Sequence, residues 1–126
     1  MARERVEKNT WNDTKTVKRK WGYEKWIENL DDYCGKVLVL EKGKKCSMHF
    51  HMNKLETMFL QAGRVDIRFR DPRNAEDYVV ELHPGDSVRI PRGQQHQIIA
   101  VEDSRLFEFS TKHEETDSYR VELGTR

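Results

Sequence analysis

The chain has 126 residues, with 23 Lys and Arg against 22 Asp and Glu, so its formal net charge at pH 7 is +1. This length predicts one domain with one hydrophobic core, and three Trp, four Tyr and five Phe argue against an intrinsically disordered chain. A net charge near zero provides no long-range attraction to nucleic acid or to a membrane surface.

Targeting segments and disulfides are not predicted. No apolar run approaches the roughly 20 residues of a membrane-spanning helix, and the N-terminal "MARERVEKNT" lacks the apolar stretch of a secretory signal. Cys34 and Cys46 are the only cysteines and form no Cys-x-x-Cys pair. We therefore expect two reduced thiols in a cytoplasmic protein with no nucleic-acid or membrane partner.

Taken in chain order, the sequence begins with a polar segment and continues with short strands. Residues 1–17 lack any period and predict a flexible N-terminal arm, while residues 18–126 predict the folded domain. A short helical turn is expected around residues 24–31. Strands with a period of two are expected at residues 36–41, 64–69, 77–82, 86–90, 96–101, 105–110 and 118–123. Turn signals separate these runs, so the fold class is all-β, as an antiparallel sandwich or barrel.

His49 and His51 stand out in "CSMHFHM" at residues 46–52. Side chains alternate between the faces of a strand, so both imidazoles would share one face. Met48 and Phe50 would then lie on the other face. If the histidines face the barrel interior, this apolar outer face must be covered by the N-terminal segment or by a second subunit, and we expect a homodimer.

Two further residues complete a candidate metal site. Glu56 follows His51 by five positions, and His96 comes shortly after Pro91 and Gly93. Three imidazoles and one carboxylate suit Zn, Mn, Fe, Ni or Co. The His-x-His pair alone is a weak signal, and a polar interior without metal is the alternative. His83 and His113 fit no ligand role and are expected at the surface.

Two longer motifs resemble those of the cupin superfamily. They are "GKKCSMHFHMNKLETMFLQAG" at residues 43–63 and "GDSVRIPRGQQHQIIA" at residues 85–100. The matching anchors are Gly43, His49, His51, Glu56, Gly63, Gly85, Pro91, Gly93 and His96. Ala100 departs from the motif, which commonly has Asn at this position, but that Asn is not a metal ligand. The four glycines fall where tight turns need a positive φ.

The resemblance implies a double-stranded β-helix, or jelly-roll, barrel. In it His49, His51, Glu56 and His96 hold one divalent metal ion. "VKRKWGYEKW" at residues 17–26 further resembles the cupin domain of type II phosphomannose isomerases and of related single-domain proteins. This second resemblance implies interconversion of an aldose and a ketose, as in mannose-6-phosphate isomerase. The metal would act as a Lewis acid while a base removes a carbon-bound proton.

The remaining site residues are candidates with open alternatives. Trp21 and Tyr23 would contact the substrate, although large rings usually serve strand packing. Glu108, flanked by aromatic residues, is the candidate catalytic base, with a solvent-facing strand residue as the alternative. Arg92 is the best-placed residue for binding a substrate phosphate. The arginines of residues 64–70 are expected to meet water.

The cupin fold alone does not define a reaction. Our preferred hypothesis is a metal-dependent isomerase of a sugar or sugar phosphate. The same ligand set serves Fe-dependent dioxygenases and metal-assisted lyases, which act on other small substrates. A sugar-binding cupin without catalytic activity is the third possibility, because no unambiguous base is present.

Overall fold

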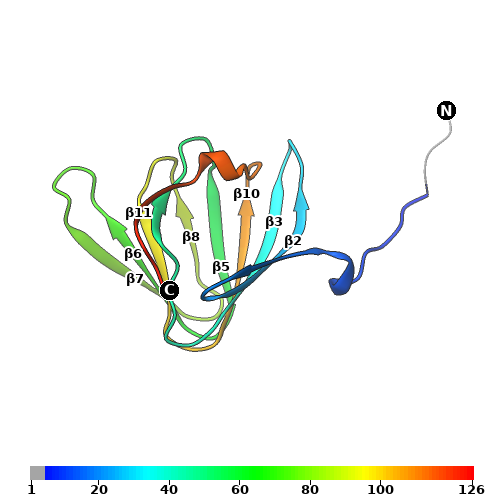
Figure 1. The fold of residues 1–126 in the computed structure, drawn as a ribbon, viewed down its shortest axis with the longest axis horizontal. Helices are drawn as coiled ribbons and strands as arrows, with labels where there is room; N and C mark the ends of the chain where they lie inside the picture. The colour runs from blue at the N-terminus through cyan, green and yellow to red at the C-terminus, as the bar shows by residue number, and fades with distance from the viewer. Residues whose placement is uncertain (1–4) are drawn as a thin grey trace.

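The computed structural model describes residues 5–126 as two antiparallel β-sheets (Figure 1). The strands are β1 (Lys15–Arg19), β2 (Gly22–Asn29), β3 (Cys34–Leu40), β4 (Met48–Phe50), β5 (Glu56–Ala62), β6 (Val65–Arg70), β7 (Asp77–Leu82), β8 (Ser87–Ile90), β9 (His96–Ala100), β10 (Ser104–Ser110) and β11 (Tyr119–Glu122). Two single turns of 3-10 helix are η1 (Trp11–Asp13) and η2 (Glu115–Asp117). No helix in this part of the chain is long and apolar enough to cross a membrane.

The strand order is that of a jelly roll. One sheet has the order β1-β2-β3-β10-β5-β8, and the other has the order β11-β4-β9-β6-β7. β10 therefore lies between β3 and β5, and β9 lies between β4 and β6, so hairpins that are distant in sequence interleave. This arrangement confirms the predicted all-β, double-stranded β-helix fold.

The core lies between the sheets and follows the alternation seen in the sequence. On β6, Val65, Ile67 and Phe69 are buried, while the residues between them are half-buried. Leu60 on β5 and Leu106 on β10 are fully buried in the same cluster. Complete burial of each such leucine stabilises the fold by about 1.5–3 kcal/mol.

Glycines make the predicted tight turns. All four motif glycines have φ between +80° and +96°. Gly63, between β5 and β6, is the most constrained, because an added Cβ would lie 2.2 Å from the carbonyl oxygen of Asp103. A left-handed backbone conformation and a backbone contact this close together exclude any side chain at this position.

The N-terminal part of the domain differs from the prediction in two respects. The helical turn expected around residues 24–31 is wrong, because this stretch lies largely in β2, which pairs with both β1 and β3. Strand β1 begins at Lys15, so the last residues of the predicted arm belong to the sheet. Residues 5–13 are exposed and extend away from the barrel (Figure 1).

The apolar face of β4 continues onto β11, its neighbour at the edge of the sheet. β11 pairs with β4 and places Tyr119 opposite Phe50. The two rings stack with their centroids 5.1 Å apart, and Met48 is completely buried. Tyr119 therefore packs beside Phe50 on the neighbouring strand, while Tyr119 itself stays 45% exposed.

Candidate metal centre

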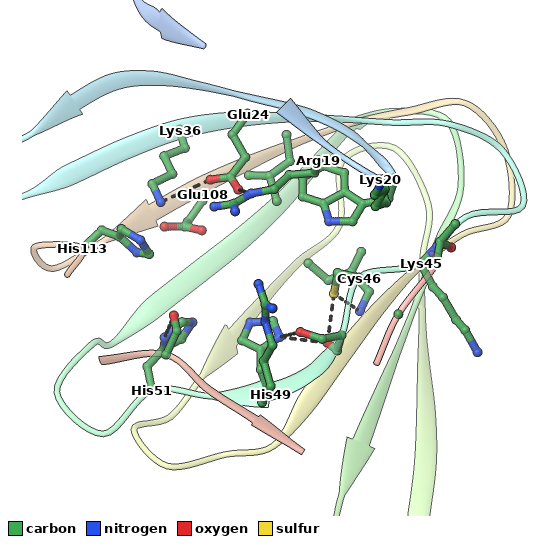
Figure 2. A pocket seen from close by; sticks show the side chains of 18 of the residues that line it. Arg19, Lys20, Glu24, Lys36, Lys45, Cys46, His49, His51, Glu108 and His113 are labelled. Atoms are coloured by element: carbon green, nitrogen blue, oxygen red, sulfur yellow. Dashed lines mark hydrogen bonds and ion pairs between the residues drawn. The ribbon is translucent and has the colours of Figure 1, made fainter. Parts of the chain in front are cut away.

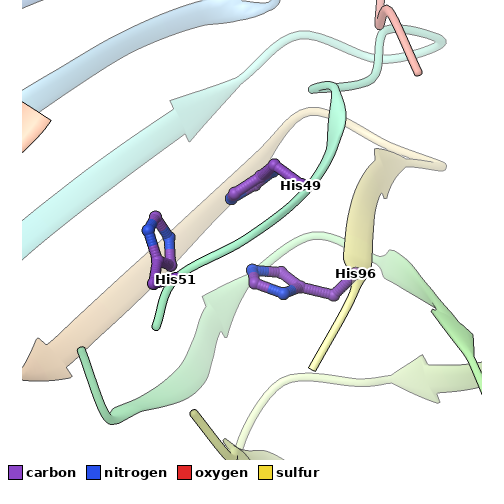
Figure 3. Close-up of side chains that lie close together, drawn as sticks. All are labelled: His49, His51 and His96. Carbon is purple, nitrogen blue, oxygen red and sulfur yellow. The ribbon is translucent and has the colours of Figure 1, made fainter. Parts of the chain in front are cut away.

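Three histidines converge between the two sheets (Figure 3). His49 on β4 lies directly opposite His96 on β9, so the two side chains share a face. His51 follows the end of β4 and returns to the same side. Ring nitrogens of all three residues lie within 4.8 Å of one another. The sequence predicts a shared face for His49 and His51, and the cupin resemblance adds His96 to their site; the structure brings all three to one centre.

Backbone carbonyls orient all three rings. Each Nδ1 lies within hydrogen-bonding distance of a carbonyl oxygen, which can only accept, so Nδ1 carries the proton. The distances are 2.8 Å from His49 to Ser47, 3.1 Å from His51 to Asp117 and 2.9 Å from His96 to Gln94. The lone pair of each ring is therefore on Nε2. Bonds of this kind fix the tautomer and the orientation of metal-binding histidines.

His49 and His51 are held in the neutral form that binds metal. Burial, together with repulsion from the neighbouring His96, lowers the pKa of His49 to about 3. Burial also lowers the pKa of His51. Because a protonated imidazole has no lone pair to donate, these shifts favour metal binding at neutral pH.

Glu56 lies beside the histidine cluster at the start of β5. Its Oε1 is 3.0 Å from Nε2 of His96 and 4.0 Å from Nε2 of His51. Burial alone would raise the pKa of Glu56, but a hydrogen bond from His96, when its Nε2 also carries a proton, and the charge of Lys54 outweigh burial, so the pKa is well below its usual value. The carboxylate is therefore ionised.

Several buried polar atoms at this centre have no hydrogen-bond partner among the described residues. They are both carboxylate oxygens of Glu56 and Nε2 of His96, although Oε2 of Glu56 has the ammonium group of Lys54 at 3.3 Å as an ion-pair partner. Buried polar atoms normally have partners, and leaving them without one is costly. One divalent cation would be held by the three imidazoles and by Oε1 of Glu56, the carboxylate oxygen that lies near His51 and His96. The donor set thus fits a single divalent metal ion, as the sequence predicts.

His49 and His51 line a cavity of about 780 Å³ (Figure 2), whereas His96 lies outside its lining. Trp21 from the β1–β2 turn lines it, together with apolar residues such as Met58 and Ile98. Tyr23 instead lines a separate, smaller cavity beside Trp11. Arg92 is exposed, contributes to neither cavity and donates a hydrogen bond to the carbonyl of Asn53 at 2.9 Å. The structure thus brings only Trp21 of the three predicted substrate residues to the metal-facing cavity.

Glu108 is buried and lines this cavity, so the alternative of a solvent-facing strand residue is wrong. Its Oε2 accepts a bond from Lys54 at 2.7 Å and from Ser110 at 3.2 Å. No such partner is found for Oε1 within residues 5–126. One oxygen is therefore anchored while the other is available to a molecule in the cavity.

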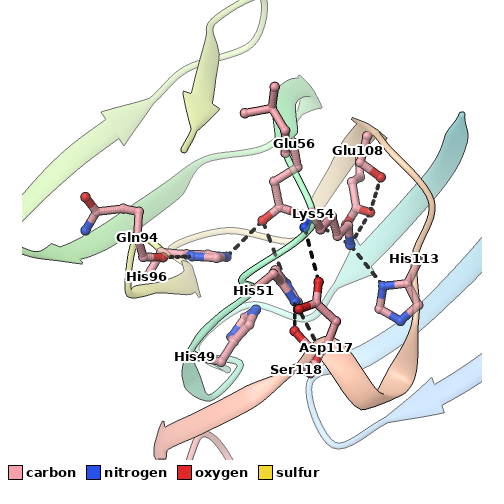
Figure 4. A network of polar contacts seen from close by, with 12 residues as sticks. His49, His51, Lys54, Glu56, Gln94, His96, Glu108, His113, Asp117 and Ser118 are labelled. Carbon is pink, nitrogen blue, oxygen red and sulfur yellow. Dashed lines mark hydrogen bonds and ion pairs between the residues drawn. The ribbon is translucent and has the colours of Figure 1, made fainter. Parts of the chain in front are cut away.

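Lys54 was not predicted from the sequence, because a lysine in a polar loop normally faces water. It is only 3% exposed and contacts Glu108, Glu56 at 3.3 Å and His113 at 3.0 Å (Figure 4). The two carboxylates raise its pKa despite burial, so it is charged. Its position two residues before Glu56, within the first motif, is the signal that could have found it.

The surface position predicted for His113 is also wrong. The residue is buried and accepts a hydrogen bond from Lys54 on Nδ1. Burial and the positive charges of Lys54 and Lys36 lower its pKa to about 4. His83, by contrast, is exposed as expected. His113 could not be found from its sequence neighbours, because the long C-terminal loop that folds it inward is polar.

The wall of the cavity provided by β2 and β3 carries a second set of buried charges. Glu24 contacts Arg19 at 2.6 Å and Lys36 at 3.3 Å. The ammonium group of Lys36 also lies 4.1 Å from the ring centroid of Trp26. These pairs leave a polar, charged surface facing the cavity, suited to a polar ligand.

A family model for the cupin domain matches residues 36–109, which contain all four predicted metal ligands. The chain belongs to the cupin family. No curated protein matches this cupin in a sequence search.

Solved structures share the fold at low sequence identity. A variant of oxalate decarboxylase from Bacillus subtilis has a TM-score of 0.79 at 18% identity, with 94% of this chain and 34% of that chain covered. The same enzyme at pH 4.6 has a TM-score of 0.77 at 18% identity, covering 94% and 33%. The capsular polysaccharide assembling protein CapF from Staphylococcus aureus has a TM-score of 0.76 at 20% identity, covering 87% and 34%. This cupin thus spans about a third of the length of these proteins.

Proposed function

We propose that this cupin is a metal-dependent enzyme that interconverts the aldose and ketose forms of a small sugar or sugar phosphate. The observation that carries the proposal is Oε1 of Glu108, which has no hydrogen-bond partner among the described residues and belongs to the same cavity as His49 and His51. A metal site and a carboxylate facing one cavity are the two components that proton transfer next to a carbonyl requires.

The chemistry divides between the two groups. A divalent ion held by the three histidines and Glu56 would supply Lewis-acid polarisation of two adjacent substrate oxygens. Glu108 takes the proton from the carbon beside the carbonyl and returns it to the former carbonyl carbon. The hydroxyl proton moves between the two oxygens, so the substrate and product have the same composition.

Lys54 and Trp21 support this reaction without taking part in it. Lys54 holds Oε2 of Glu108 and so directs Oε1 towards the cavity. Trp21 is 8% exposed and belongs to the hydrophobic core, so its ring offers a rigid apolar contact for the C–H face of a sugar. Tyr23 and Arg92 have no role in this proposal, because they lie outside the cavity.

A metal-assisted lyase or Fe-dependent dioxygenase acting on a small acid is the second candidate. It is favoured by the fold shared with oxalate decarboxylase over 94% of the chain and by the three-histidine, one-carboxylate donor set. Oxygen uptake or cleavage of the substrate separates these reactions from isomerisation, which consumes and releases nothing.

The test is a coupled assay of the metal-loaded protein with mannose 6-phosphate and related sugars. We expect turnover of at least one sugar, and a loss of roughly 10²–10⁴-fold in kcat for Glu108→Gln, the usual contribution of a general base. The control is Glu81→Gln, which removes an exposed carboxylate outside the cavity. Absence of turnover across the panel, or turnover that Glu108→Gln leaves unchanged, contradicts the proposal.

We also propose that this cupin forms a homodimer through the outer face of the six-stranded sheet. Phe107 and Phe109 on β10 and Phe59 on β5 lie close together there, with ring centroids 6.0 Å apart for Phe59–Phe107 and 6.4 Å for Phe107–Phe109. Phe109 is 56% exposed. A second copy would remove this aromatic surface from water.

A further inference from the structure

Positive charge is concentrated around the metal-facing cavity. Eight Lys and Arg and four Glu line it, whereas the whole chain is nearly neutral. The cations deep in the cavity are neutralised: Arg19 and Lys36 contact Glu24, and Lys54 contacts Glu108. The unpaired positive charge therefore comes from other residues of the cavity lining.

The remaining five cations are exposed at the cavity entrance. Among residues 5–126, none of them has a carboxylate within 4.0 Å. They are Lys18, Lys20, Lys45, Arg120 and Arg126. Like charges that gather without a counter-charge raise the local potential and attract anions.

These cations come from segments on different sides of the entrance. Lys18 lies near the end of β1 and Lys20 in the turn from β1 to β2. This turn, and not β2 itself, lies beside the C-terminal end of the chain (Figure 1). Arg120 lies on β11, and Lys45 precedes β4. Lys20 and Lys45 border the same end of the cavity (Figure 2). An anion in the entrance would therefore meet cations from both sides.

Arg120 links the entrance to the metal centre. It lies opposite His49 in the β11–β4 pairing, so the two side chains share the face that borders the cavity. A guanidinium group matches the paired oxygens of a phosphate or carboxylate, which a lysine ammonium does not. A small molecule bound to Arg120 would thus extend directly towards the histidines.

We propose that the entrance is an anion-binding subsite, centred on Arg120 and Lys20, for the phosphate or carboxylate of a small substrate. The uncharged part of that substrate reaches the histidine cluster. The inference rests on the proposed function only in placing the substrate in this cavity. Arg120 and Lys20, and not Arg92, then bind the charged group, because Arg92 lies outside the cavity.

The subsite is tested by isothermal titration of the metal-loaded full chain with inorganic phosphate and, separately, with malonate. The variants are Arg120→Gln and Lys20→Gln, with Arg89→Gln as the control. Arg89 is exposed on β8, has no ion pair within the described residues and does not line the cavity. All samples carry the same metal, so anion binding to the ion itself is common to them.

We expect each cavity variant to weaken binding of one or both anions about tenfold, as loss of a charge-assisted hydrogen bond does. The control should stay within about twofold. The anion that is affected more identifies the charged group of the substrate. Equal affinities in Arg120→Gln, Lys20→Gln and Arg89→Gln, or no saturable binding to the unaltered protein, would overturn the subsite.

Failure of the subsite can be told apart from failure of the isomerase proposal. Glu108→Gln should lose turnover while binding both anions as the unaltered protein does. If no sugar is turned over but Arg120→Gln still weakens anion binding, the subsite stands and only the reaction is wrong.

Discussion

Replacement of Lys54 by Met tests the buried charge network directly. The substitution keeps an unbranched side chain of similar length but removes the ammonium group, which contacts Glu108 at 2.7 Å, His113 at 3.0 Å and Glu56 at 3.3 Å. Both carboxylates then stay buried without their cation. Breaking a buried ion pair by removing one partner costs about 3–5 kcal/mol.

The chain offers a closely matched control. Lys112 contacts Asp31 at the same distance, 2.7 Å, but their side chains are 45% and 88% exposed. Exposed pairs of this kind contribute little to stability. Lys112→Met should therefore leave the free energy of unfolding nearly unchanged.

The assay is urea unfolding of both variants in the presence of a chelator, so that metal binding does not contribute to stability. The loss for Lys54→Met should also depend on pH. Because the pKa of Glu56 is lowered in the folded state, Glu56 stabilises the fold at pH values above its usual pKa of 4.5. This contribution is lost as the pH falls through the folded-state pKa. Without Lys54, the pKa of Glu56 in the folded state is lowered less. The free energy of unfolding lost in Lys54→Met should therefore be larger at pH 7 than below pH 4. An equal, small effect of Lys54→Met and Lys112→Met would refute the reasoning.

Three further predictions follow from single residues. The pKa of His113 falls from 6.5 to about 4 on folding, so the metal-free protein should lose stability as the pH drops from 6.5 to 4. In urea unfolding at a series of pH values, His113→Gln should lose less stability over this range than the unaltered protein. Gly63→Ala should cost more than about 2 kcal/mol in the same assay, and clearly more than Gly43→Ala, whose added Cβ meets nothing within 4 Å. Phe109→Asp should convert a dimer to a monomer in light scattering, whereas a dimer that persists would place the interface elsewhere.

Much of the fold and of the metal centre follows from local sequence patterns. The period-two alternation of Val65, Ile67 and Phe69 predicts both the strand and its buried face. His49 and His51 share a face for the same reason, and the glycine-bounded motifs link them to His96. The strand and the shared face depend on residues close together in the chain, whereas the link to His96 depends on the cupin resemblance.

The parts that were missed depend on tertiary packing. Residues 24–31 were expected to form a helical turn because isolated charges there hide the strand period, and pairing with β1 and β3 decides the outcome. Lys54 and His113 are polar residues in loops, and only the folded C-terminal segment buries them together. Arg120 faces the cavity because β11 pairs with β4 in one particular register.

The proposed reaction depends on metal binding by the histidine cluster, and metal content measures that binding most directly. Elemental analysis of the purified protein after loading and removal of free metal should give one divalent ion per chain. His51→Ala should lose that ion while its far-ultraviolet circular dichroism stays that of a folded β-protein, and His83→Ala, which removes an exposed histidine, should retain it. Full metal content in His51→Ala would contradict the assigned centre.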